Sequence, residues 1–125
     1  MTLVDALLKS SDADRDVLRK NRELGDNPLA LRPLDFLFYA SSKEKADLVA
    51  SFCTDNGYGD ALVSHRPDNK EASQWHLLVR IEAPATEAVV CSLSGLMECL
   101  AHLFKIEYDG WGGAIVRDVG PANLG

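Results

Sequence analysis

The segment Pro84–Lys105 constrains the fold more than any other stretch, because it predicts one long amphipathic helix. Its apolar side chains recur three or four positions apart, the spacing of a helix with one buried stripe. Pro84 suits the first helical turn, where the missing N–H costs nothing. At about 1.5 Å per residue the helix would span roughly 30 Å, the width of a small domain. The stripe consists of Val89, Leu93, Leu96, Met97, Leu100 and Phe104.

Alternating apolar and polar residues predict strands on both sides of this helix. The predicted elements are a strand at Leu34–Ala40, a helix from a Ser41/Glu44 capping box to Asn56-Gly57, strands at Tyr58–Arg66 and Gln74–Glu82, the long helix, and a strand at Ile106–Asp109 or a little further. The order β-α-β-β-α-β predicts an α+β, ferredoxin-like sandwich. Right-handed crossovers then place both helices on one face of an antiparallel sheet.

The two faces of the predicted sheet differ in character. One face is the expected core, with Leu34, Phe36, Phe38, Trp75, Leu77, Val79 and Ile81. The other carries Leu37, Tyr39, His76, Leu78 and Arg80. Because this open face would expose apolar side chains to water, we expect either the N-terminal helices or a partner to cover it.

An N-terminal helical extension precedes the first strand. Leu3–Leu24 predicts one interrupted helix or two short ones, with Thr2 and Ser11 as candidate N-caps. Its apolar face is thin, so we expect it to lie on the surface and to be docked by tertiary contacts. The predicted organisation is therefore an extension at residues 1–30, the sandwich at 31–117 and a tail at 118–125.

Composition narrows the classes of function. The chain has 125 residues and a formal net charge of −6, which argues against direct binding of nucleic acid. No apolar run approaches the roughly 20 residues of a membrane span, and no signal peptide is indicated. Three cysteines, all in predicted helices, favour a reducing compartment over disulfides. We expect a cytoplasmic protein that does not contact membranes.

A search for catalytic or metal-binding patterns leads to no reaction. His102 and Cys99 lie three positions apart on the long helix, but a buried thiol beside a partly exposed imidazole explains them better than a metal does. Ser94 lies inside a helix and not in a nucleophile elbow. Gly110–Gly113 lacks the spacing and lysine of a phosphate loop. We expect no catalytic residue, no metal and no cofactor.

The run Glu107–Gly113 carries two large aromatic residues and three glycines. Tyr108, Asp109 and Trp111 have two open interpretations: a plug that closes one end of the core, or a partner-binding patch of aromatic and acidic side chains. A second hypothesis places a small ligand on the open face near Tyr39, His76 and Arg80, in a domain that is either a monomer or a homodimer. Direct RNA binding is disfavoured, because the charge is acidic and the stacking-aromatic pattern is missing.

The sequence Glu107-Tyr108-Asp109-Gly110-Trp111-Gly112 resembles the hallmark of the regulator of ribonuclease E activity B (RraB) family. The loop Asp26–Leu31 and the pair Gly57-Tyr58 are similar to that family's pattern. The resemblance implies a ferredoxin-like fold and a cytoplasmic bacterial protein. It also implies that the protein is not an enzyme, and that it binds a ribonuclease E-like endoribonuclease or its scaffold region and lowers RNA cleavage.

Overall fold

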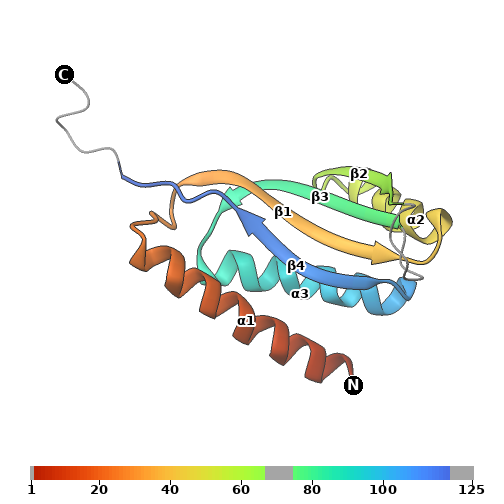
Figure 1. The fold of residues 1–125 in the computed structure, drawn as a ribbon, viewed down its shortest axis with the longest axis horizontal. Helices are drawn as coiled ribbons and strands as arrows, with labels where there is room; N and C mark the ends of the chain where they lie inside the picture. The colour runs from red at the N-terminus through yellow and green to blue at the C-terminus, as the bar shows by residue number, and fades with distance from the viewer. Residues whose placement is uncertain (1, 67–74, 119–125) are drawn as a thin grey trace.

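The computed structural model describes residues 2–66 and 75–118, and in these residues it shows a four-stranded sheet and three α-helices (Figure 1). In chain order the elements are α1 (Leu3–Glu23), β1 (Leu31–Ala40), α2 (Lys43–Asp55), β2 (Asp60–His65), β3 (Trp75–Pro84), α3 (Glu87–Phe104) and β4 (Glu107–Gly113). The strands are arranged β2-β3-β1-β4, and every neighbouring pair is antiparallel. The predicted α+β class is therefore confirmed.

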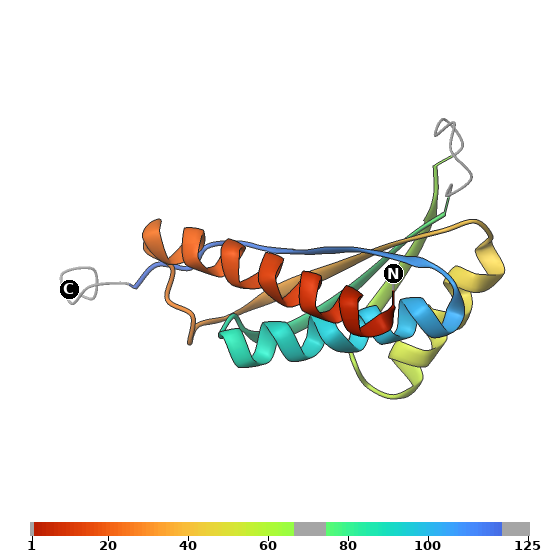
Figure 2. The same ribbon diagram turned by 90° about the horizontal axis from the view of Figure 1, so that it is seen from below.

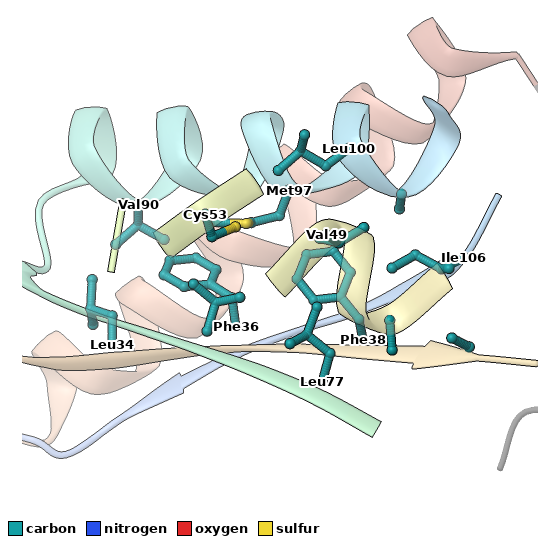
Figure 3. Close-up of a cluster of buried hydrophobic side chains, with 14 of the residues drawn as sticks. Leu34, Phe36, Phe38, Val49, Cys53, Leu77, Val90, Met97, Leu100 and Ile106 are labelled. Carbon is teal, nitrogen blue, oxygen red and sulfur yellow. The ribbon is translucent and has the colours of Figure 1, made fainter. Parts of the chain in front are cut away.

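The core lies between the sheet and the two helices α2 and α3. Leu34, Phe36 and Phe38 of β1 are fully buried, as are Leu77 and Val79 of β3. Figure 3 shows Leu34, Phe36, Phe38 and Leu77 pointing toward side chains of both helices. The helix side chains are Val49 and Cys53 from α2, with Val90, Met97 and Leu100 from α3. The alternation in the sequence thus assigned the core face of these strands correctly.

Two helix starts differ from the predictions by one to three residues. Pro84 is the last residue of β3, and the long helix starts after Thr86, whose hydroxyl accepts a hydrogen bond from the Val89 N–H. The N-cap of α2 is Ser42 and not Ser41, and its hydroxyl accepts from the Lys45 N–H. In both cases a serine or threonine in extended conformation satisfies an N–H that has no partner within the helix.

The N-terminal extension is one uninterrupted helix that lies alongside α3 (Figures 1 and 2). Thr2 is its N-cap, as expected, and also forms a capping box with Asp5, whereas Ser11 lies in mid-helix. A Cβ on Gly95 of α3 would lie 3.7 Å from Leu7 of α1, an ordinary van der Waals contact, so the packing of the two helices here does not require a glycine. Of the two alternatives for the open face of the sheet, coverage by the N-terminal helix is wrong, because α1 packs against α3 on the helical side of the sheet (Figures 1 and 2).

A buried ion pair organises the connection between α1 and β1. The Arg32 guanidinium pairs with the Asp26 carboxylate, and both side chains are almost fully buried. Arg32 also donates to the carbonyl oxygens of Asn27, Ala30 and Ala114. The Val116 N–H donates to Asp26 at 2.8 Å. The loop that resembles the RraB pattern is therefore held by one charged pair, which also fixes the chain after β4.

The length and composition of α3 bear on the prediction that the chain has no membrane span. Among the described residues it is the one helix that is long and apolar enough to span a membrane by length and composition alone. In this fold it is the central helix, with Val90, Met97 and Leu100 buried in the core. The connection between the strands predicted at Tyr58–Arg66 and Gln74–Glu82, and the predicted tail after residue 118, lie outside the described residues.

Candidate partner-binding site

A β-bulge in β4 turns both large aromatic residues of the Glu107–Gly113 run toward the helices. Tyr108 pairs with Phe38 and Trp111 pairs with Phe36, although an odd spacing of three would normally place them on opposite faces. The register shifts between these two pairs, so that Asp109 is the extra residue. The bulge therefore separates the three predicted site residues: two point inward and one does not.

Trp111 ties the sheet to the N-terminal helix. Its indole N–H donates to the Asp14 Oδ1 at 3.0 Å. Asp14 lies in the middle of α1 and is 4% exposed. Its Oδ2 has no hydrogen-bond partner among the described residues. Burial raises the pKa of this carboxyl, and the polar groups of Ser94 and Trp111 nearby oppose the rise only in part.

Tyr108 joins a second polar link between the same elements. Its hydroxyl lies 2.7 Å from the Ser94 Oγ of α3, which in turn lies 3.2 Å from the Ser10 Oγ of α1. Its ring packs against Phe38, with 5.3 Å between the ring centroids. Burial raises the pKa of the Tyr108 hydroxyl well above its usual range, so it stays protonated. This half of the predicted patch is thus built into the contact between α1, α3 and the sheet.

Asp109 is the member of the run that faces solvent. It is exposed, and its carboxylate accepts a hydrogen bond from the Tyr39 hydroxyl at 3.1 Å. The next residue, Gly110, has φ +120°, a conformation that side chains disfavour, which explains the glycine after the bulge. The exposed acid of the predicted partner-binding patch is therefore held in place by Tyr39.

The residues predicted for a small-ligand site are only partly brought together. The Tyr39 ring packs edge-on against His76, with 4.5 Å between centroids, and burial lowers the pKa of the imidazole. Arg80 is four residues further along β3, roughly 13 Å away at 3.3 Å per residue. Its guanidinium donates two hydrogen bonds to Asp35, at 2.7 and 2.9 Å. Arg80 therefore does not converge with the other two residues.

A groove of about 540 Å³ lies where α1, the end of α3 and β4 meet. It combines Asp109 and Tyr108 with residues that sequence analysis did not single out as a site, above all Asp14 and Glu98. Burial raises the pKa of the half-buried Glu98 carboxyl. The lining residues are Ala6, Lys9, Ser10, Ala13, Asp14, Tyr39, Glu98, Ala101, His102, Ile106, Glu107, Tyr108, Asp109 and Gly110.

One sequence signal could have revealed the helical part of this groove. Ser10 and Asp14 lie four residues apart on α1, and Ser94 and Glu98 repeat that spacing on α3. Residues at this spacing share one face of a helix. Two helices that each carry a serine and a carboxylate on one face can pair those faces. In the described part of the chain no group of three or more His, Cys, Asp or Glu residues is placed to hold a metal ion.

A comparison with protein families shows to which family the chain belongs. The model of the RraB family, described as regulator of ribonuclease activity B, matches residues 11–113. The chain belongs to the RraB family. The matched region runs from the middle of α1 to the end of β4 and contains the whole Tyr108–Gly112 run. No individually curated protein matches the chain. The resemblance read from that run is confirmed, and RraB is a family of ribonuclease regulators.

Proposed function

We propose that this RraB-family chain is a non-catalytic protein that binds a ribonuclease E-type endoribonuclease, or its scaffold region, and lowers RNA cleavage. The observation that carries the proposal is the family match over residues 11–113. The net charge of −6 agrees with a basic partner segment, because opposite charges steer association. The exposed Asp109 carboxylate offers such a segment an acceptor.

Two further assignments accompany this function. The order β-α-β-β-α-β after α1, with strands arranged β2-β3-β1-β4, supports classifying the domain as ferredoxin-like. The three free cysteines support a reducing, cytoplasmic location in a bacterium. We propose no small-ligand function for the open face, since Arg80 is paired with Asp35 and lies apart from His76.

A reconstituted cleavage assay tests the proposal. A purified ribonuclease E-type enzyme, with and without its scaffold region, cleaves a fluorogenic RNA in the presence of increasing amounts of the chain. We expect a saturable fall in the cleavage rate. We also expect Asp109→Ala to weaken inhibition by about tenfold, the effect of removing a strong interface contact.

The matched control is Asp55→Ala, which removes an exposed carboxylate at the end of α2. It should leave inhibition unchanged. A cleavage rate that stays constant at saturating chain, with both forms of the enzyme, would contradict the proposed function. Circular dichroism of both variants confirms that they are folded, because Asp109→Ala also removes the acceptor of the Tyr39 hydroxyl.

A further inference from the structure

The groove between α1, α3 and β4 carries an excess of carboxylates. Four of its lining side chains are acidic: Asp14, Glu98, Glu107 and Asp109. Lys9 is the one lysine or arginine in the lining. Asp14 is buried and Glu98 half-buried, whereas Glu107 and Asp109 are exposed. The acids thus run from the interior of the groove to its rim.

The innermost acid is the one with unsatisfied bonding capacity. Asp14 is 4% exposed, and Trp111 occupies only its Oδ1. The Oδ2 has no hydrogen-bond partner among residues 2–66 and 75–118. Because Oδ2 is closed to solvent, Asp14 acts on a ligand in this groove through its charge, and a cationic group bound there gains a favourable electrostatic interaction with it.

The chemistry of the lining selects among possible ligands. Phosphate groups are disfavoured, because four carboxylates would repel them. A guanidinium fits better than an ammonium, since it presents five N–H donors in a rigid fork that can serve several carboxylate oxygens at once. Tyr39 and Tyr108 also line the groove, and aromatic rings attract guanidinium groups.

We propose that this groove binds an arginine side chain from a basic segment of the partner protein. The inference rests on the proposed function for the identity of that partner, but the recognition chemistry comes from the groove itself. Glu107 and Asp109 attract the segment at the rim, Glu98 receives the guanidinium, and the charge of the buried Asp14 adds to the attraction. The N-terminal helix is then part of the binding site, because it contributes Asp14.

A peptide titration tests this assignment directly. The probe is a short glycine-flanked peptide with two arginines, compared with the same peptide carrying lysine or the neutral arginine analogue citrulline. Binding to the full chain is followed by amide NMR shifts, which are expected to change at Ser10, Glu98 and Gly110. We expect the arginine peptide to bind more tightly than the lysine peptide, and the citrulline peptide not to bind.

Two double variants with the same change in net charge separate the groove from general attraction. Glu98→Gln with Glu107→Gln should weaken binding of the arginine peptide by about tenfold, as expected for the loss of two close charges. Asp55→Asn with Glu23→Gln removes two exposed acids away from the groove and should change affinity less than about twofold, the effect of screened distant charges. If the first double variant does not fold, Glu107→Gln alone serves, because Glu107 is exposed.

Three results would overturn the assignment: no binding of the arginine peptide, equal binding of the lysine peptide, or equal weakening by both double variants. The cleavage assay separates this inference from the proposed function. If Glu98→Gln with Glu107→Gln inhibits the ribonuclease as strongly as the wild type, the groove assignment fails and the function stands. If the peptide binds as expected but no ribonuclease is inhibited, the function fails and the groove assignment stands.

Discussion

At the scale of single residues, the hydrogen bond from Trp111 to Asp14 is the contact with the greatest consequence. Trp111→Phe keeps an aromatic ring but removes the N–H. The buried Asp14 carboxylate then loses the hydrogen bond to its Oδ1, and its Oδ2 has no partner among the described residues. We expect a loss of about 1–3 kcal/mol in the free energy of unfolding, measured by urea denaturation. Trp75→Phe is the control, because its ring stacks on the exposed His65.

A double-mutant cycle isolates the bond from the ring. In an Asp14→Leu background no buried carboxylate remains, so Trp111→Phe should cost less than half of what it costs in the wild type. Residues in direct contact show coupling energies of about 0.5–3 kcal/mol in such cycles. Equal costs in the two backgrounds would show that the ring alone matters.

Asp14 also gives the stability of the protein a pH dependence with a definite sign. Burial raises its pKa above the ordinary value of 3.8, so the folded state holds this proton more tightly than the unfolded state does. Stability therefore rises as the pH falls through the raised pKa, and the gain is complete below the ordinary value. Asp14→Asn cannot titrate. We expect the unfolding free energy of the wild type minus that of this variant, measured by urea denaturation at each pH, to grow as the pH falls from about 7 to about 4. A difference that stays constant over this range would contradict the prediction.

At the scale of elements, the buried pair of Arg32 and Asp26 fixes the entry to β1 and the chain after β4. Arg32→Met leaves the Asp26 carboxylate buried without its cation and removes the donor to three carbonyl oxygens. We expect a loss of about 3–5 kcal/mol in thermal or urea denaturation. Arg80→Met is the matched control, because it breaks an ion pair with Asp35 whose arginine is 54% exposed. That pair should contribute about 0–1 kcal/mol, and similar losses in the two variants would show that burial of the first pair adds nothing.

The elements also show how far sequence alone could go. Strict alternation in β1 and β3 made their core face predictable, because a sheet covered on one side repeats every two residues. The bulge in β4 could not be predicted. One added residue inverts the alternation of side chains, and the glycines of this strand have no side chains that would show the inversion. That α1 is docked was predicted, but its position against α3 and β4 was not, because the links pass through Ser10 and Asp14, and polar contacts leave no hydrophobic period.

The unpredicted bulge and helix position explain why only part of the candidate site was predicted. Tyr108 and Trp111 stood out in the sequence because large aromatics between glycines are uncommon, yet both side chains turn toward the helices. Asp109 stood out with them and does reach solvent. Glu98 and Asp14 did not stand out, because an acid within an amphipathic helix is normally a solvated residue, and their shared spacing from Ser94 and Ser10 gains meaning only when the two helices pack together. Only the packing of two helices revealed them as neighbours.

At the scale of the whole molecule, α1 is bonded to the domain it precedes, and this predicts how the protein unfolds. If the Asp14–Trp111 and Ser10–Ser94–Tyr108 links couple the helix to the sheet, both should be lost in one transition. In a Trp75→Phe background the remaining tryptophan fluorescence reports Trp111, while circular dichroism reports all helices. We expect the two probes to give the same urea midpoint. A fluorescence change that precedes the loss of helix would show that α1 leaves a sheet that stays folded, and the groove would then open before the core does.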